Sequence, residues 1–143
     1  MRVLFASAEL APLVRVGGLA EAAGGLVASL RAAALEDPEG ERDFACLSAK
    51  RKNGKPVRTT VRTIYSSELV RRADAGYTIS VEGDGFLYKM VRMMVGAAVE
   101  TARGRRDNDW IRAMLENPDE TERCSACAPA GGLYLVGVDY SAR

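Results

Sequence analysis

Five residues that are polar or small lie at spacings of three or four within residues 85–103, a stretch that is otherwise almost entirely apolar: Lys89, Arg92, Gly96, Glu100 and Arg103. On a helix this spacing places them in one narrow stripe. An arginine on a mostly buried helix needs a carboxylate or a phosphate as its partner, because a buried unpaired charge is very unfavourable. Gly96 lowers helix stability by about 1 kcal/mol relative to alanine, and it allows another group to approach the backbone closely. The simplest interpretation is a core helix with one solvated edge, and the alternative is a helix whose arginine meets a specific acidic group.

A second group of charges lies between residues 50 and 62. All its members are positive, and no acidic residue separates them: Lys50, Arg51, Lys52, Lys55, Arg58 and Arg62. Asn53-Gly54 is a turn signal and Pro56 follows it, so we expect these residues on a loop. Such a loop can be simply solvated. It can also contact the phosphates of a nucleic acid, where each neutralised phosphate adds affinity and salt sensitivity.

The residue types that are absent or scarce narrow the possible chemistry. The sequence has no histidine, which removes the commonest general base and excludes a Ser-His or Cys-His nucleophile within this chain. Its three cysteines are an odd number, which argues against a disulfide framework and for a reducing compartment. Cys124 and Cys127 have only Cys46 besides them, so we expect incidental thiols and no metal site.

The overall composition is that of an ordinary globular domain. The 143 residues are 48% apolar and 27% charged, and the net charge of +1 does not favour a polyanionic partner. Any argument for nucleic acid therefore depends on local patches. No apolar run approaches the length of a membrane span, and the apolar residues 3–6 are too short for a secretory signal. We expect a cytoplasmic protein.

The hydrophobic pattern predicts an α+β fold. The predicted elements, in order, are a strand at 3–6, a helix at 19–35, a hairpin of strands at 59–70 and 76–84, a helix at 85–103, a second helix capped by Asp107 or Asn108 and ended at Asn117-Pro118, and a strand at 133–140. This order is a ferredoxin-like βαββαβ arrangement with one extra helix. We expect an antiparallel sheet that is covered by helices on one face.

Several ordered motifs point to a known family. DFACL, RTTVRTI, YTISVEGDGFLYKMVRMMVG and GLYLVGVDY resemble the C-terminal half of the tRNA pseudouridine synthases of the TruA family, over about residues 43–140. The resemblance implies isomerisation of uridine to pseudouridine in tRNA, without a metal or cofactor, by an enzyme that works as a dimer. It implies that Arg92 pairs with the catalytic aspartate of the other half and that Leu133 lines the pocket for the flipped uridine. It also favours RNA contact by the basic residues, which are Lys50, Arg51, Lys52, Lys55, Arg58 and Lys89.

One further match to this family is misleading. The segment from Arg72 to Gly76, which contains Asp74, looks like the R-T-D-x-G loop that carries the family's catalytic aspartate. It lacks the threonine and falls in a hairpin turn, a poor place for a buried catalytic group. We therefore assign no catalytic aspartate in this chain and expect weak or no activity from the chain alone.

The beginning of the chain resembles a different family. Residues 1–31 resemble the N-terminus of bacterial glycogen and starch synthases, in which a basic, glycine-containing loop holds the diphosphate of a sugar nucleotide. Arg15, Gly17 and Gly18 correspond to that loop, although a purely structural strand-loop-helix unit is the simpler interpretation. We expect a chimera, with residues 1–35 forming this strand-loop-helix and completing the sheet of residues 36–143. The functional hypotheses are a pseudouridine synthase-like protein, a non-catalytic RNA-binding module and a remnant nucleotide-sugar binder.

Overall fold

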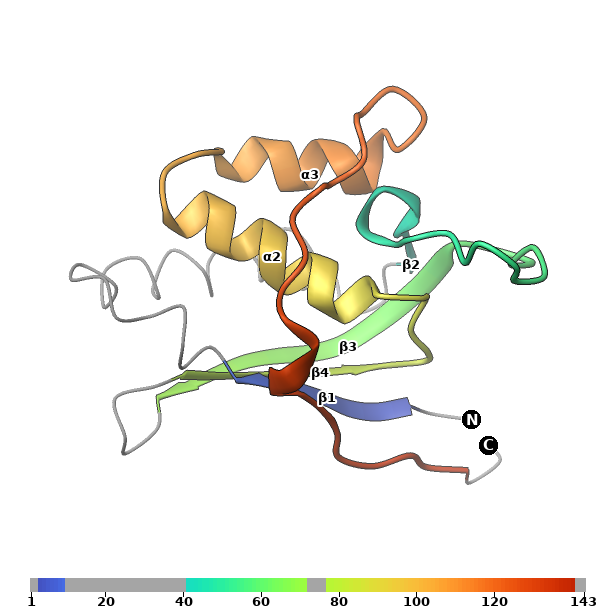
Figure 1. The fold of residues 1–143 in the computed structure, drawn as a ribbon, viewed down its shortest axis with the longest axis vertical. Helices are drawn as coiled ribbons and strands as arrows, with labels where there is room; N and C mark the ends of the chain where they lie inside the picture. Colours follow the sequence, from blue (N-terminus) through green and yellow to red (C-terminus); the bar gives the residue numbers. More distant parts are fainter. Residues whose placement is uncertain (1–2, 10–40, 72–76, 141–143) are drawn as a thin grey trace.

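The structure is a computed structural model of the chain, and it describes residues 3–9, 41–71 and 77–140. The described residues form a five-stranded sheet with two α-helices on one of its faces (Figure 1). The strands are β1 (Val3–Glu9), β2 (Glu41–Asp43), β3 (Val61–Arg71), β4 (Tyr77–Gly83) and β5 (Leu133–Leu135), and the helices are α2 (Met90–Ala102) and α3 (Asn108–Glu116). Short 3-10 turns at Ala45–Leu47 and Ala130–Gly132 precede the basic loop and β5 respectively.

The strand order confirms the predicted fold class. The order across the sheet is β2-β3-β4-β1-β5, and every neighbouring pair is antiparallel. Leaving out the short edge strand β2, this is the ferredoxin-like order, in which the first strand lies between the third and the last. The predicted hairpin is confirmed as β3 and β4. The predicted helix at 19–35 lies outside the described residues.

The central helix begins later than the sequence pattern predicts. Residues 85–89 are not helical: Tyr88 and Lys89 lie in a turn, and α2 starts at Met90, with Lys89 in the left-handed conformation at φ 60°. A residue in this conformation cannot continue a right-handed helix, so Lys89 separates the turn from the helix. The Leu87 carbonyl accepts a hydrogen bond from the Met90 N–H at 3.0 Å and closes the turn.

The core lies between the sheet and the two helices. Ile79 and Val81 of β4 and Met90 and Val95 of α2 are each at most 1% exposed. Helix α3 packs on α2 and also contacts the edge strand β2. Its residues Ile111 and Met114 are at most 2% exposed. The predicted N-cap of this helix is confirmed, because the Asp107 carboxylate accepts the Trp110 N–H at 3.0 Å. Among the described residues no helix has the length and apolarity that a membrane span requires.

The sheet differs from the prediction at both edges. Strand β2 is absent from the sequence-based prediction, and β5 ends at Leu135 although the pattern predicts a strand through residue 140. Leu133 and Leu135, two residues apart in this strand, differ in burial: Leu133 packs against the core, whereas Leu135 is 68% exposed. Both β2 and β5 pair with one neighbour only. The lengths of β2 and β5 therefore depend on their tertiary surroundings, which cannot be predicted from the alternation of apolar and polar residues.

Candidate functional site

Arg92 is held against the segment that leads to the last strand. Its Nε donates a hydrogen bond to the Ala128 carbonyl at 2.7 Å, and the Ala128 N–H donates to the Arg92 carbonyl at 2.9 Å. The side chain is half-buried. Among the described residues, no ion pair and no further hydrogen bond involves the rest of its guanidinium. The arrangement fixes the position of the arginine while leaving its terminal nitrogens able to bind an acid.

The same segment covers Gly96, one helical turn further along α2. A Cβ added at Gly96 would lie 2.7 Å from the carbonyl carbon of Ala126 and 2.8 Å from the backbone nitrogen of Cys127. The prediction that Gly96 allows a close approach is therefore confirmed. The expectation of one continuous solvated edge is wrong, because Gly96 is buried. The covering group is residues 124–128, which we call the covering segment.

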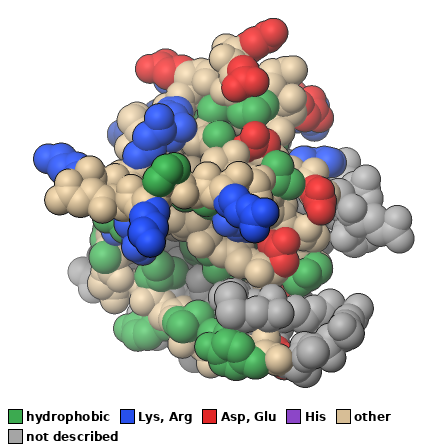
Figure 2. All heavy atoms as spheres, turned by 90° about the vertical axis from the view of Figure 1, so that its right-hand side faces the viewer, with side chains coloured by type: hydrophobic (Ala, Val, Ile, Leu, Met, Phe, Trp, Pro, Cys, Tyr) green, Lys and Arg blue, Asp and Glu red, His purple; other side chains and the backbone are tan. Residues whose placement is uncertain are grey.

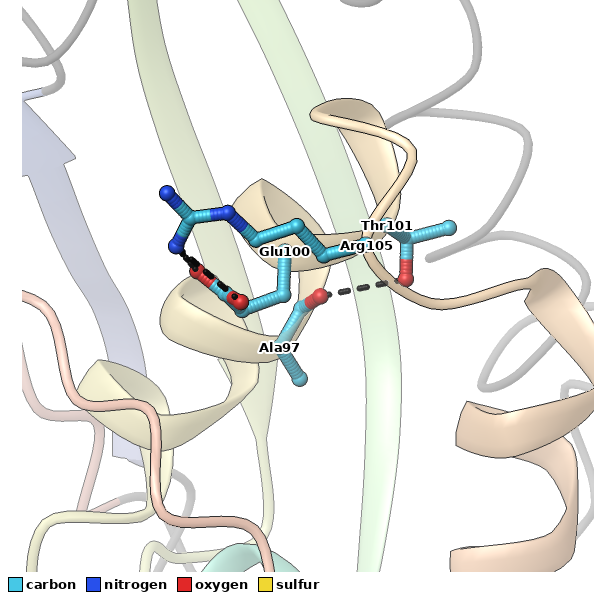
Figure 3. A network of polar contacts seen from close by, with 4 residues as sticks. All are labelled: Ala97, Glu100, Thr101 and Arg105. Carbon is cyan, nitrogen blue, oxygen red and sulfur yellow. Dashed lines mark hydrogen bonds and ion pairs between the residues drawn. The ribbon is translucent and has the colours of Figure 1, made fainter.

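Glu100, the acidic residue of the polar stripe, is not the partner of Arg92. Glu100 forms an ion pair with Arg105 at 3.1 Å, at the far end of the helix (Figure 3). In the same view the Thr101 hydroxyl donates to the Ala97 carbonyl at 3.1 Å, and Arg103 is exposed beyond it. Glu100 therefore pairs with a residue just beyond the end of α2, and an acid for Arg92 has to come from elsewhere.

Leu133 lies a few residues after the covering segment. A 3-10 turn at Ala130–Gly132 joins the segment to β5, whose first residue is Leu133. The leucine is partly buried and packs against the core. Arg92, through Ala128, and Leu133 thus lie at the two ends of one short connection.

The predicted basic loop is confirmed as a loop. Its five cations are all exposed, and among the described residues no ion pair neutralises them: Lys50, Arg51, Lys52, Lys55 and Arg58. Arg62 differs from them, because it lies in β3 and its Nη1 donates to the Thr59 carbonyl at 2.9 Å. Figure 2 shows this end of the molecule, with several Lys and Arg side chains on its face and acidic side chains gathered at its upper and right-hand margins.

Tyr88 joins this loop to the start of α2. The Arg51 guanidinium carbon lies 5.0 Å from the centre of the Tyr88 ring, and the Lys89 ammonium nitrogen lies 5.5 Å from it. The Ala49 N–H donates to the Tyr88 carbonyl at 3.0 Å. The sequence pattern counted Tyr88 among the apolar positions of a buried helix, but it precedes the helix and is 42% exposed. The sequence did contain one signal for Tyr88: it is the neighbour of Lys89, a residue that was chosen as a candidate for RNA contact because of its charge.

An open groove of about 670 Å³ lies next to the loop. Its lining residues come from β2, from β3 and the residues just before it, and from the turn after β4: Glu41, Thr59, Val61, Arg62, Asp84, Gly85 and Phe86. Two carboxylates and one guanidinium line it, and the Asp84 carboxylate already accepts the Thr63 N–H at 3.0 Å. A phosphate is therefore better accommodated on the loop than in the groove.

Comparison with known proteins decides the family. Residues 34–141 match the family model described as tRNA pseudouridine synthase. The chain is 41% identical over 108 residues to tRNA pseudouridine synthase A of Leuconostoc citreum, which covers 75% of this chain and 40% of that protein. It is 40% identical over 102 residues to the protein of the same name from Chlamydia pneumoniae, covering 71% of this chain and 36% of that protein.

The chain belongs to the tRNA pseudouridine synthase family. The chain spans about two fifths of the length of the relatives it matches. Residues 2–36 match a second model, described as starch synthase catalytic domain, so both predicted resemblances are confirmed. Strand β1, which lies in this second match, pairs with β4 and β5 of the pseudouridine synthase match.

The cysteines of this family member are all free. Cys46 and Cys124 are buried, and desolvation raises the pKa of both thiols. The Cys46 thiol donates to the carbonyls of Pro118 and Thr121. Neutral, hydrogen-bonded thiols in these positions pack the core and are not nucleophiles. Cys127 is exposed.

Two sets of predicted site residues lie outside the described residues. They are the phosphate-loop-like residues Arg15, Gly17 and Gly18, and Asp74 of the misleading aspartate motif. The interpretation of both sets stays a prediction from the sequence.

Proposed function

We propose that this chain acts as the arginine-bearing part of a tRNA pseudouridine synthase and takes part in converting uridine to pseudouridine in tRNA. The observation that supports it most is the state of Arg92. One nitrogen of its guanidinium holds the Ala128 carbonyl, and the remaining donors have no partner among the described residues. A half-buried guanidinium is stabilised by a carboxylate that meets it with two parallel hydrogen bonds. In this proposal that carboxylate is the catalytic aspartate of the other half, as the family resemblance implies.

Arg92 is a positioning residue in this proposal. The isomerisation replaces the bond from the sugar to N1 of uracil with a bond to C5, so the hydrogen on C5 is released. An aspartate paired with Arg92 stays ionised and fixed in orientation, because the opposite charge favours the carboxylate form. The covering segment keeps the guanidinium in place while uridine enters, and Leu133 provides an apolar wall near it.

The basic loop supplies the contact with tRNA in this proposal. Exposed lysines and arginines that lack intramolecular partners release condensed counterions when they bind phosphates. The loop is adjacent to the groove and to the start of α2, so it can hold an RNA strand against this end of the domain. The compartment we propose is the cytoplasm.

The decisive experiment measures release of tritium from C5-labelled uridine in tRNA. We expect little or no release by the chain alone. Adding a fragment of the Leuconostoc citreum relative that carries its aspartate should restore release. Arg92→Ala should abolish the restored activity, whereas Arg103→Ala, which removes an exposed cation of the same helix, should not. Release by the chain alone that survives Arg92→Ala would refute the role of Arg92. Binding of tRNA without release in the mixture would instead identify a non-catalytic RNA-binding module.

A gel-shift titration tests the loop separately. Replacing Lys50, Arg51, Lys52 and Lys55 together with glutamine should weaken tRNA binding. It should also reduce the slope of log affinity against log salt by roughly one for each phosphate that the variant no longer neutralises. If the unmodified chain produces no shift at low salt, the proposed RNA contact is wrong.

We also propose that residues 1–35 act as a structural part of the domain. Support comes from β1, which lies in the interior of the sheet between β4 and β5. Removing an interior strand exposes two rows of backbone groups and one side of the core. Deletion of residues 1–31 should therefore abolish cooperative unfolding in a thermal melt. A truncated chain of unchanged stability would refute this assignment.

Self-association is the last part of the proposal. Four large apolar side chains are more than half exposed on and after β5: Tyr134, Leu135, Val136 and Tyr140. An exposed apolar surface of this kind is typical of a protein interface. Sedimentation equilibrium should detect dimers that are weakened by Leu135→Asp. A monomer at all concentrations would contradict a homodimer.

A further inference from the structure

Tyr88 is an exposed aromatic residue between two cations that come from different parts of the chain. Arg51 belongs to the basic loop, and Lys89 is the residue that precedes α2. Their charged groups lie 5.0 Å and 5.5 Å from the centre of the tyrosine ring. Even with both cations close by, the residue remains 42% exposed. A tyrosine whose only task was to pack the loop onto the domain would bury more of its ring.

The backbone around Tyr88 is built to hold the ring at the surface. The Ala49 N–H binds the Tyr88 carbonyl at 3.0 Å, which fastens the beginning of the loop to this residue. Lys89 is the one non-glycine residue with positive φ among those the structure describes. This conformation is unfavourable for a lysine and persists only when its surroundings impose it. The neighbouring residues Leu87 and Met90 are buried, so the turn is anchored on both sides.

We propose that Tyr88 stacks on an unpaired base of the bound RNA, and that Arg51 and Lys89, which lie over its ring in the free chain, move to the phosphates on either side of that base. This inference rests on the proposed function and adds to it a residue that selects single-stranded nucleotides. Aromatic rings stack on any base, because every base has a π-face, and cations beside the ring hold the backbone. A base within a duplex has both faces covered by its neighbours. Tyr88 and its two cations should therefore bind loops and other unpaired segments of RNA more tightly than helical stems.

The groove beside the loop is a weaker candidate for the same contact. Its lining contains two carboxylates and no exposed aromatic ring with paired cations. Negative charge repels the RNA backbone, and a base needs an accessible flat surface. Tyr88 with its two cations is the position that offers both stacking and charge.

Fluorescence anisotropy with the full chain and two labelled RNAs tests this inference. One RNA is a hairpin with an unpaired loop, and the other is a blunt duplex of equal length. Tyr88→Ala should weaken binding of the hairpin by about 5- to 150-fold, the range expected for one base stack. It should change duplex binding by less than about 2-fold and leave the salt slope unaltered. Tyr88→Phe, which keeps the ring, should bind the hairpin almost normally. Val57→Ala serves as the control for loss of exposed apolar surface, because Val57 lies in the neighbouring basic loop and is 57% exposed.

A spectroscopic measurement covers the case in which the alanine variant folds poorly. With 2-aminopurine in the hairpin loop and saturating protein, stacking on Tyr88 should change the emission, and Tyr88→Leu should remove this change while keeping apolar bulk. Equal losses for hairpin and duplex, or a reduced salt slope, would mean that Tyr88 only positions Arg51, and the stacking proposal would be wrong. Unchanged hairpin affinity would overturn the inference while leaving RNA binding intact. Failure of the unmodified chain to bind either RNA would overturn both proposals.

Discussion

The polar stripe of α2 has a covered middle and two open ends. In the middle, Gly96 lies directly under the covering segment, and Arg92 binds Ala128 of the same segment. At the first end, Lys89 is exposed beside Tyr88. At the other end, Glu100 and Arg105 form an ion pair close to solvent. Residues with the same spacing in the sequence therefore have different surroundings, because residues 124–128 cross the helix at one place only.

The difference separates two kinds of interaction. In the middle, backbone atoms of two segments lie so close that one methyl group changes the packing. At the ends, charged groups interact through water and tolerate small displacements. We therefore expect substitutions in the middle to change stability and substitutions at the first end to change binding.

The largest expected effect follows from filling the space at Gly96. A Cβ at this position would be 2.7 Å from the Ala126 carbonyl carbon, so backbone would have to move. We expect Gly96→Val to lower the free energy of unfolding by about 3 kcal/mol through overpacking. Gly96→Ala gains about 1 kcal/mol in helix propensity, and a net loss of about 1 kcal/mol should remain. Urea denaturation measures both values.

Gly131 provides the matched control for this comparison. A Cβ added there would meet no heavy atom within 4 Å. Gly131→Ala should therefore change the free energy of unfolding by less than about 0.5 kcal/mol. If Gly96→Ala were more stable than the unmodified chain, the covering segment would not rest on the helix in solution.

Local sequence patterns were sufficient for elements whose signals are themselves local. The alternating residues predicted the hairpin of β3 and β4, and Asp107, one of the two residues predicted as the cap of α3, is the cap. The same kind of reasoning placed the start of α2 five residues too early, since apolar periodicity continues through residues 85–89. It could not register that Lys89 adopts a left-handed conformation.

The candidate site depended on contacts between distant segments. Spacing identified Arg92 and Gly96 as one stripe, and it correctly suggested that something approaches Gly96. It could not identify the covering segment, which lies far along the chain from α2 and is bound through backbone atoms of Ala126 and Ala128. Tyr88 was missed for a related reason, because its exposure results from the turn before α2 and its neighbour Arg51 belongs to another loop.

A smaller effect is expected when the hydrogen bond of Arg92 is removed. Arg92→Met keeps most of the aliphatic stem and leaves the Ala128 carbonyl without the donor that now lies 2.7 Å away. We expect a loss of about 1–2 kcal/mol in the free energy of unfolding, since the bond has a charged donor and is partly buried. Arg103→Met, at an exposed position of the same stripe, should cost less than about 0.5 kcal/mol. Equal effects of the two substitutions in urea denaturation would remove the distinction between middle and end.

The two cysteines of the covering segment differ in their exposure to solvent. Cys127 is exposed, whereas Cys124 and its backbone partner Cys46 are 4% and 1% exposed. A maleimide reagent should therefore modify Cys127 in the folded chain and reach the other two only on unfolding. Rapid modification of Cys124 in the native chain would show that the segment opens readily.

The pH dependence of stability follows from the same two buried thiols. Burial raises their pKa in the folded chain, so the unfolded chain loses these protons first. Their contribution is fully present below the unfolded thiol pKa of about 8.5 and is lost as the pH rises through the raised folded pKa. Above the unfolded thiol pKa of about 8.5 we therefore expect the free energy of unfolding to fall as the pH rises. Substituting both with alanine should remove that part of the decline, and an unchanged decline would assign it to other groups.

The smallest effect is expected at the open end of the stripe. Arg105 and Glu100 lie 3.1 Å apart, with side chains 63% and 25% exposed. Solvent screening limits the contribution of such an ion pair to the free energy of unfolding to a few tenths of a kcal/mol. The Arg105 N–H also donates to the Glu100 carbonyl at 3.0 Å, and Arg105→Gln preserves this backbone contact. We therefore expect Arg105→Gln to change the free energy of unfolding by less than about 0.5 kcal/mol, with an even smaller difference at about 1 M salt. A loss above about 1 kcal/mol would mean that this end is held as tightly as the middle, because an exposed ion pair alone cannot account for so large a change.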